Sequence, residues 1–522
     1  MSSQRFVRSS DGVRIAVFEH GDPDGPTLVL VHGHSDTHRI WDEVAALLAD
    51  RFRIVAYDLR GAGESDAPKP ASAYTVERFA DDLAAVLDGN TAVHVLAHGA
   101  GTAGVWHYLK RPGARIASLT SVSGAGPEHL AARLRTAMTA PGRFIRGMAR
   151  TATVTPYRAN PRTVLADLRT DVPVQLIVSA RDRGVDPHVY DALPSRVPRL
   201  WRRDITTGPV TPASHPGVLA RAVTQLVDHL DGAPAARELL RAETGRRRKT
   251  FGDTLVAVTG AASGIGRETA LAFARDGADV VISDVDSAGL EETARLVAAT
   301  GSAAHTYTVD VSDAAAVEEM AERVCAEHGV PDIVVNNAGI GHAGFFLDTP
   351  AEEFDRVMDI NFGGVVNGCR SWGKRLVDRG TGGHIVNVAS MASYTPVNVM
   401  NPYCTSKAAV FMFSDCLRAE LDSAGIGLTT ICPGIIGTNI VNTTRFSLPE
   451  ARSYDAEAIR RRVRKGFAVR RVGPDKVARA IVAAVRKNKP VRPVTAEAYL
   501  VYGVSHAFPQ VMRSTARGGN IM

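Results

Sequence analysis

The chain has 522 residues, more than one typical domain, and its content of 45% hydrophobic and 22% charged residues is typical of a folded globular protein. Its formal net charge of +6, from 61 basic and 55 acidic residues, is too small for this length to indicate a nucleic-acid partner. The polar start, the lack of a long apolar run and five cysteines without a Cys-x-x-Cys pair predict a cytoplasmic protein with reduced thiols, no transmembrane span and no metal site.

Short β-branched runs alternate with helical stretches through the first half, which is typical of a parallel sheet covered by helices on both faces. The periodicity predicts a helix over Pro216–Leu230. The predicted strands are Thr27–Val31, Arg53–Tyr57, Val93–Ala97, Leu119–Val122, Val174–Val178 and Leu200–Arg203.

Three motifs follow these strands. His32-Gly33-His34 comes after the first, Asp58-Leu59-Arg60-Gly61 after the second, and His98-Gly99-Ala100-Gly101 has the shape of a strand–elbow–helix turn. Together they resemble the α/β-hydrolase fold, and most closely its epoxide hydrolases, over about residues 5–230. The resemblance implies a nucleophile at the elbow, an acid and a histidine after later strands, and a lid.

The catalytic positions of that family are altered. Gly99 stands at the nucleophile position and Pro209 at the histidine position, and only the acid position keeps its residue, Asp182. The lid is also reduced, because only 47 residues separate Gly124 from Val172. We therefore expect a degenerate hydrolase domain, in which His32 and Asp58 serve the fold.

A junction rich in turn-forming residues follows, over about Asp231–Asp253. It includes a short helical piece and the basic run Arg246–Lys249, which we interpret as a solvated linker. The predicted organisation is a hydrolase-like domain over 1–232, a linker over 233–252 and a second domain over 253–522.

The second domain opens with a strand, Leu255–Thr259, that runs into a glycine-rich turn and then a helix from about Ile265 to Asp276. Glycines at these spacings allow a tight turn, close approach of a pyrophosphate and close helix packing, with the helix N-terminus facing the phosphates. The turn residues assigned to cofactor binding are Gly260, Ser263, Gly264, Ile265 and Gly266.

Asp284 follows the next predicted strand, Val280–Ser283, and lies 20 residues past Gly264. A carboxylate there would accept hydrogen bonds from the adenine ribose and repel a 2′-phosphate. Because Ser263 is neutral and no arginine directly follows Asp284, the sequence predicts NAD rather than NADP.

Tyr403 and Lys407 are four residues apart and share one face of a predicted helix. An ammonium group beside a phenol favours the phenolate, so we expect the pKa of Tyr403 to be lowered and Tyr403 to exchange a proton with a substrate oxygen. Ser390, at the end of the predicted strand His384–Ala389, could hydrogen-bond the same oxygen.

These motifs resemble the short-chain dehydrogenases/reductases, over about residue 253 to the end of the chain. The resemblance implies a Rossmann-fold, doubly wound parallel sheet, a catalytic set of Asn361, Ser390, Tyr403 and Lys407, and pairing of subunits through the helix that carries Tyr403. Asn361 would hold a water of the proton relay. Besides the glycine turn, Asp284, Tyr403 and Lys407, the implied cofactor contacts are Asp310, Val311, Asn337, Ala338, Gly339, Pro433, Gly434 and Thr438.

The sequence indicates the substrate less clearly than the cofactor. In the family the segment after Thr438 forms a lid, and here it holds Asn439–Phe446 and five basic residues within Arg460–Lys465. We interpret this basic stretch as a solvated helix face, with binding of an anionic carrier or a membrane surface as the alternative. The tail Ala496–Arg517 is mildly amphipathic and suits a partner subunit or lipid.

A degenerate epoxide hydrolase joined to a short-chain dehydrogenase resembles the actinobacterial, chiefly mycobacterial, EphD-type fusions. We expect an NAD-dependent oxidoreductase that interconverts a secondary alcohol and a ketone, with a lipid-derived substrate. One alternative is a bifunctional epoxide hydrolase and oxidoreductase. Another is a first domain that only binds substrate or a partner. Substrate identity, reaction direction and oligomeric state are not determined by the sequence.

Overall fold

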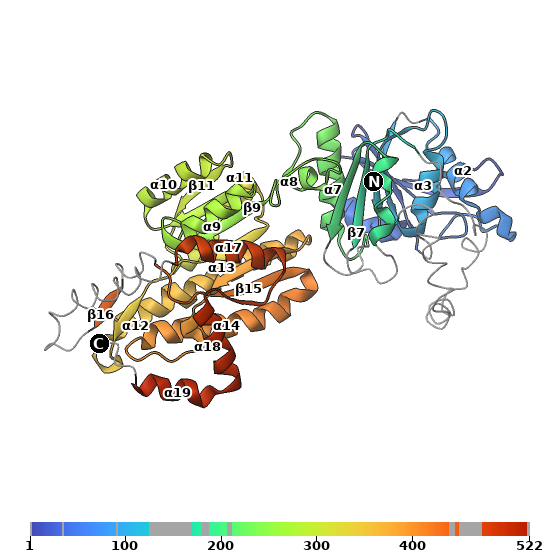
Figure 1. Cartoon of the computed structure of the whole chain (residues 1–522). Coiled ribbons are helices and arrows are strands. Elements are labelled where there is room, and N and C mark those ends of the chain that lie inside the picture. The colour runs from blue at the N-terminus through green and yellow to red at the C-terminus, as the bar shows by residue number, and fades with distance from the viewer. Residues whose placement is uncertain are drawn as a thin grey trace. The chain divides into compact units, whose positions relative to one another are not determined.

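The computed structural model describes residues 3–33, 36–89, 92–124, 169–179, 187–205, 211–437, 444–447 and 472–518. The chain forms two compact units, Met1–Arg247 and Arg248–Met522 (Figure 1). The division lies inside the predicted junction, and the domain bounds of 1–232 and 253–522 stay predictions.

The first unit is built on one eight-stranded sheet with the order β1-β2-β4-β3-β5-β6-β7-β8. The strands from β3 to β8 are parallel to one another, whereas β1 and β2 pair antiparallel. The strands are β1 Ser3–Arg8, β2 Arg14–Gly21, β3 Thr27–Val31, β4 Arg53–Tyr57, β5 Val93–His98, β6 Ile116–Val122, β7 Val174–Ser179 and β8 Leu200–Ile205.

The predicted α/β-hydrolase fold is confirmed, and the antiparallel strands β1 and β2 at one edge were not among the predicted strands. β1 carries charged and exposed side chains, as an edge strand that avoids pairing with other chains does, and it has no continuous apolar run to mark it. The predicted strands are confirmed, with ends that differ by no more than three residues.

Helices cover both faces of this sheet. Val29 and Val95 face a core shared with α2 Val76–Val86 and α3 Thr102–Tyr108. Leu28 precedes Val29 on β3 and Leu96 follows Val95 on β5, so both side chains point to the opposite face of the sheet. There they pack in a second core shared with α1 Asp42–Leu48 and α7 Pro216–Leu230. The bounds of α7 match the prediction, and α8 Arg237–Ala242 is the short helical piece of the junction.

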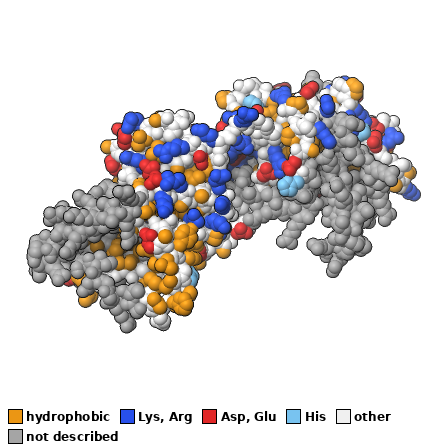
Figure 2. Space-filling model, viewed as in Figure 1, with side chains coloured by type: hydrophobic (Ala, Val, Ile, Leu, Met, Phe, Trp, Pro, Cys, Tyr) orange, Lys and Arg blue, Asp and Glu red, His pale blue; other side chains and the backbone are white. Residues whose placement is uncertain are grey.

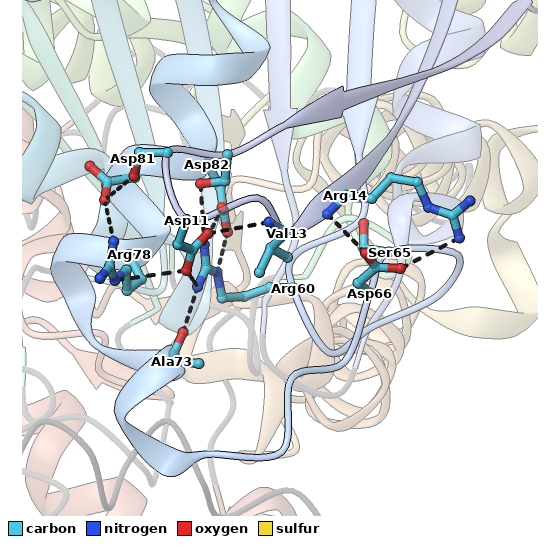
Figure 3. Close-up of polar contacts among 12 residues, drawn as sticks. Asp11, Val13, Arg14, Arg60, Ser65, Asp66, Ala73, Arg78, Asp81 and Asp82 are labelled. Carbon is cyan, nitrogen blue, oxygen red and sulfur yellow. Dashed lines mark hydrogen bonds and ion pairs between the residues drawn. The ribbon is translucent and has the colours of Figure 1, made fainter.

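A buried ion-pair network, drawn in Figure 3, connects α2 with two loops of the first unit. Arg60, just after β4, donates to both carboxylate oxygens of Asp82 on α2, at 2.7 and 2.6 Å. The same guanidinium donates to Asp11 in the β1–β2 turn at 2.9 Å and to the carbonyl of Ala73 at 2.7 Å. Because the side chains of Arg60 and Asp82 are both fully buried, each depends on the other.

The second unit is built on a seven-stranded, all-parallel sheet with the order β11-β10-β9-β12-β14-β15-β17. The strand order reverses beside β9, which is the doubly wound arrangement that was expected and that opens a crevice at the carboxyl ends of β9 and β12. The strands are β9 Leu255–Thr259, β10 Asp279–Asp284, β11 Ala304–Thr308, β12 Ile333–Asn336, β14 Gly383–Val388, β15 Ile426–Cys432 and β17 Val491–Pro493.

Two layers of helices enclose this sheet (Figure 1). Val256 and Val258 face α9 Gly264–Arg275, α10 Ser287–Ala298 and α17 Pro474–Arg486. The opposite face packs against α11 Ala314–His328, α13 Gly364–Arg379 and α14 Asn401–Leu421. The remaining elements are α12 Ala351–Met358, α18 Ala496–Ala507, α19 Pro509–Gly518 and the pair β13 His342–Gly344 and β16 Arg445–Ser447.

Among the described residues, no helix has the length and apolar character needed to cross a bilayer. None of the five cysteines forms a disulfide.

Candidate functional site

The glycine turn after β9 has no room for a side chain at Gly260 or at Gly266. Gly260 has a φ of +66°, and a methyl group on it would lie 2.8 Å from the Cα of Ala338. A methyl group on Gly266 would lie 2.0 Å from the carbonyl oxygen of Gly260. The amide of Asn337 closes the turn by donating to the carbonyls of Thr259 and Gly260, at 2.9 and 3.2 Å. The result is a compact backbone cradle at the start of α9.

The first turn of α9 supplies the polar surface of this cradle. Ser263 is the N-cap residue and Gly264 is the first helical residue. The first backbone N–H groups of a helix have no partner within the helix, and they favour an anion such as a pyrophosphate. Ile265 packs against the core between α9 and the sheet, which fixes the direction of the helix.

Asp284 ends β10 next to the same turn. Its two carboxylate oxygens accept the backbone N–H groups of Ala262 at 3.0 Å and Asp286 at 3.1 Å. Arg267 donates to the carbonyls of Ala262 and Gly289 and to Thr293 Oγ1, so its guanidinium is engaged within the fold. The cradle and the fixed carboxylate thus lie side by side at the carboxyl ends of β9 and β10.

Asp310 and Val311 follow β11, at the carboxyl edge where β9, β10 and β12 also end. Asp310 accepts the backbone N–H of Ser312 at 2.9 Å and its hydroxyl at 2.7 Å. Val311 is buried, and its carbonyl accepts the side-chain amide of Asn367 at 2.9 Å. This arrangement offers a formed loop where the resemblance implies contact with the adenine.

Asn337, Ala338 and Gly339 form the loop after β12. The backbone N–H groups of Asn337 and Ala338 both donate to Thr259 Oγ1, at 3.0 and 3.1 Å, which ties this loop to the end of β9. A methyl group on Gly339 would lie 3.0 Å from Asn361 Oδ1 and 3.3 Å from Lys407 Nζ. The loop therefore runs between the cofactor cradle and the predicted catalytic side chains.

Asn361 lies in a π-helical turn, Asp359–Gly363, between α12 and α13. Its amide accepts from the backbone N–H of Ile340 at 2.8 Å and donates to the carbonyl of Ile340 at 3.0 Å and to Ser406 Oγ at 3.1 Å. π-Helical turns are rare and are found frequently at functional sites. Asn361 is fully buried and links the loop after β12 to α14.

Ser390 and Tyr403 come together from two elements. Ser390 lies two residues beyond β14, where its hydroxyl accepts from the backbone N–H of Ala392 at 3.1 Å and caps a short 3₁₀ helix, Met391–Ser393. Tyr403 lies in the first turn of α14 and makes a side-chain hydrogen bond with Ser390. A substrate oxygen placed between these two hydroxyls would meet both.

Lys407 is buried one turn further along α14, and its Nζ donates to the carbonyl of Val388 at 2.9 Å. Burial lowers the pKa of Lys407 to about 8. The expected lowering of the Tyr403 pKa was wrong for this structure: burial raises the pKa of Tyr403, and the hydrogen bond with Ser390 only partly opposes this. The physical reason is that the Lys407 ammonium is itself desolvated and directed at a carbonyl.

The desolvated Lys407 predicts a pH-dependent cost in stability. A lysine that titrates near 8 when folded and at 10.5 otherwise destabilises the fold below pH 8, and this cost fades as the pH rises towards 10.5. We expect Lys407→Met to raise the free energy of unfolding by up to about 3 kcal/mol at pH 7 and by little at pH 10.5. Thermal unfolding of variant and wild type across this range measures the difference. The same difference at both pH values would contradict the prediction.

Pro433 and Gly434 follow β15 and form another loop beside the predicted catalytic residues. The carbonyl of Pro433 accepts the backbone N–H of Met391 at 2.8 Å, which places this loop beside Ser390. A methyl group on Gly434 would lie 2.1 Å from Thr495 Oγ1, so the start of α18 packs directly against it. Thr438, the Asn439–Asn442 part of the predicted lid and the basic stretch Arg460–Lys465 lie outside the described residues.

Two supporting groups were missed by the sequence reasoning. The hydroxyl of Ser393 accepts from the backbone N–H of Ser390 at 3.2 Å and donates to the carbonyl of Lys407 at 2.8 Å, joining the two catalytic segments. Behind them, Asn336 donates to Asn387 at 2.9 Å and Asn387 to Ser414 at 2.9 Å. The Ser-x-x-Ser spacing was a capping signal for the first, whereas the second depends on strand register.

The first unit keeps the elbow but lacks its side chain. β5 leads into a 3₁₀ turn, Gly99–Gly101, and then α3, and Gly99 has a φ of +54°. A methyl group at Gly99 would find its nearest neighbour, the Cα of Gly33, at 3.8 Å, so the space for a nucleophile is present. The other two diagnostic residues, Asp182 and Pro209, and most of the predicted lid lie outside the described residues.

His32 and Asp58 are buried within the framework of the elbow. His32 accepts the backbone N–H of Leu59 at 2.9 Å, and Asp58 accepts from both the backbone and the ring of His38, at 2.8 and 2.9 Å. This agrees with a role in the fold. His98 lies 3.9 Å from Asp36, and His34 lies outside the described residues.

Comparison with known families assigns both units. Residues 254–447 match the family described as short chain dehydrogenase, and residues 26–161 match the family described as alpha/beta hydrolase fold. The first match supports an oxidoreductase with a nicotinamide cofactor. The second confirms the fold class of the first unit.

The similar proteins include one that spans nearly the whole chain. This chain is 54% identical to "Probable oxidoreductase EphD" of Mycobacterium tuberculosis over 580 residues, which cover 98% of each protein. It is 31% identical to rat 17-beta-hydroxysteroid dehydrogenase 13 over 53% of this chain and 86% of that protein. A short chain dehydrogenase/reductase from Burkholderia phymatum, solved in complex with NAD, is 27% identical with a TM-score of 0.46, over 50% of this chain and 95% of that one.

Proposed function

This chain belongs to the EphD family of fused hydrolase-fold and short-chain dehydrogenase proteins, and we propose that its second unit is an NAD-dependent enzyme that interconverts a secondary alcohol and a ketone. The observation that supports the proposal is the hydrogen bond between Ser390 and Tyr403, with Lys407 buried one turn further along the same helix, in the unit that also forms the tight glycine turn before α9.

The residues of the cradle would hold the cofactor. The N-terminus of α9 would bind the pyrophosphate, Asp284 the adenine ribose, and Asp310 and Val311 the adenine. Ala338 and Gly339 would line the floor, and Pro433, Gly434 and Thr438 would contact the nicotinamide side. When bound, the nicotinamide supplies the hydride acceptor or donor of the reaction.

Proton transfer is the part that this chain's own side chains perform. Ser390 would hold the substrate oxygen and Tyr403 Oη would give or take its proton. Lys407, fixed by the carbonyl of Val388, would position this part of α14 rather than lower the pKa of Tyr403, which burial raises. Asn361, which faces the same side of Gly339 as Lys407, would hold the water that connects this pair with solvent.

The proposal is tested by titrating the full-length protein with NADH and NADPH while nicotinamide fluorescence is recorded. We expect micromolar binding of NADH and much weaker binding of NADPH, followed by turnover in a screen of secondary alcohols and ketones. If the protein bound neither nucleotide, the proposal that the second unit is an NAD-dependent enzyme would be rejected.

Asp284 is the residue that should set the preference for NADH. Replacing it by serine removes the negative charge that would repel a 2′-phosphate. It also removes the two carboxylate oxygens that would accept hydrogen bonds from the ribose hydroxyls. We expect Asp284→Ser to narrow the NADH-to-NADPH affinity ratio by about tenfold to a hundredfold. Asp310→Ser, which alters an adenine-side carboxylate, is the matched control and should leave the ratio unchanged. An unaltered ratio in Asp284→Ser would reject this assignment.

The first unit is proposed to be inactive as a hydrolase, because Gly99 offers no nucleophile and Pro209 no base. We expect the full-length protein to show no epoxide hydrolysis above the uncatalysed rate. We also expect Asp182→Ala to behave like wild type. Epoxide-to-diol turnover that Asp182→Ala abolishes would instead establish the bifunctional alternative.

A lipophilic substrate is supported by the apolar segment Phe345–Leu347 after β13. The segment is exposed, and its approach is fixed because Gly344 donates to the carbonyl of Val399 at 2.7 Å, just before α14. β13 also pairs with β16, in the predicted lid region. Pairing of subunits through α14, whose Met412 is exposed, and a cytoplasmic location are part of the same proposal.

A further inference from the structure

The two C-terminal helices leave apolar side chains uncovered. α18 carries apolar residues around its whole circumference, yet Ala498 is its only fully buried residue. Tyr499, Leu500, Phe508 and Val511 are 43%, 68%, 64% and 50% exposed, and we call these four residues the C-terminal apolar surface. Figure 2 shows hydrophobic side chains gathered over α18 and the start of α19. A surface of this kind marks an interaction site.

Two arginines, Arg492 and Arg513, border this surface. The guanidinium of Arg492 lies 5.4 Å from the ring centroid of Tyr499, and Arg513 is exposed on α19. The acidic groups near α18 are Glu497 in its first turn and Asp415 of α14, which lies near Tyr502 and His506. Aromatic and leucine side chains with a basic rim are suited to the interface of an anionic bilayer. α18 has 12 residues, too few to cross one.

The surface is held rigidly beside the predicted active site. Tyr394, four residues after Ser390, donates to the carbonyl of Ala498 at 3.2 Å, and its ring lies edge-on to Tyr502 with centroids 5.3 Å apart. Thr495 caps α18 by accepting the backbone N–H of Ala498 at 3.3 Å. A partner bound at α18 is therefore bound next to the segment that carries Ser390.

We propose that the C-terminal apolar surface docks this protein on an anionic lipid bilayer. The four apolar side chains enter the interfacial layer, and Arg492 and Arg513 contact the headgroups. Charge favours lipid over a second copy of the chain, because a two-fold contact through this surface would bring the basic groups of both copies together. Docking does not depend on the dehydrogenase chemistry, and it would give the active site direct access to lipophilic substrates.

Co-sedimentation of the full-length protein with vesicles tests the proposal. We expect binding to vesicles of equal parts phosphatidylglycerol and phosphatidylcholine, and much weaker binding to pure phosphatidylcholine. The double variant Leu500→Asp/Phe508→Asp should weaken binding by about tenfold or more, and Arg513→Gln by about fivefold. Added salt should weaken the wild type as well.

The control is Leu47→Asp, which places one negative charge on an exposed leucine of α1 in the other unit and should leave binding unchanged, whereas the single variant Leu500→Asp, with the same charge change, should weaken it. Circular dichroism checks that each variant is folded. Equal binding of the double variant and wild type, or equal weakening by Leu47→Asp, would overturn the proposal. Self-association that only the double variant abolishes, without vesicle binding by wild type, would assign the surface to a second copy.

Discussion

Tyr403→Phe is expected to lower kcat by about 10²–10⁴-fold while the affinity for NADH stays within about twofold. Phenylalanine keeps the ring at the start of α14 but removes the hydroxyl that is proposed to exchange a proton with a substrate oxygen beside Ser390. Because burial raises the pKa of Tyr403, the phenol is held protonated and suits the donation of a proton to a ketone oxygen. Steady-state rates and nucleotide fluorescence measure the two quantities separately.

Tyr394→Phe provides the control. It removes a phenol hydroxyl that donates to the carbonyl of Ala498 in the same unit, but that hydroxyl is used within the fold. We expect its turnover to stay close to that of wild type. If both substitutions reduced turnover alike, the loss in Tyr403→Phe would be structural. If neither did, Tyr403 would not be the acid or base.

Local patterns were enough to predict most of the architecture. Each of the two sheets has buried strands that read as continuous apolar runs, and the end positions of β3, β4 and α7 match the prediction. β1 was missed because an edge strand with Arg5 and Arg8 has no such run. Glycine spacing predicted the tight turn before α9 because the constraint on such a turn is itself local.

Energies at the site could not be predicted in the same way. The four-residue spacing places Tyr403 and Lys407 on one helix face, but burial, which is a property of the whole unit, raises the pKa of the first and lowers that of the second. The network behind the site depends on β12 pairing with β14 so that Asn336 lies opposite Asn387. Residues 51 positions apart give no sequence signal of that register.

The stability of the first unit is expected to depend strongly on the ion pair between Asp82 and Arg60. We expect Asp82→Ala to lower the free energy of unfolding of this unit by about 3–5 kcal/mol, because it leaves the fully buried Arg60 guanidinium without its bidentate partner. Three of the four tryptophans, Trp41, Trp106 and Trp201, lie in this unit. Tryptophan fluorescence of the full-length protein in urea therefore reports mainly on its unfolding.

The neighbouring Asp81→Ala is the matched control, drawn in the same view in Figure 3. Asp81 pairs with Arg111 at 2.6 Å but keeps part of its carboxylate in solvent, so its loss should cost only about 1 kcal/mol. Replacing both buried partners, as Arg60→Met/Asp82→Leu, should recover much of the stability, since no charge then remains buried. Equal effects of Asp81→Ala and Asp82→Ala would show that the buried pair does not hold the unit together. If the large loss is observed, the unit keeps a stability-determining ion pair although it has no nucleophile at Gly99, which is the pattern expected of a domain retained for its fold.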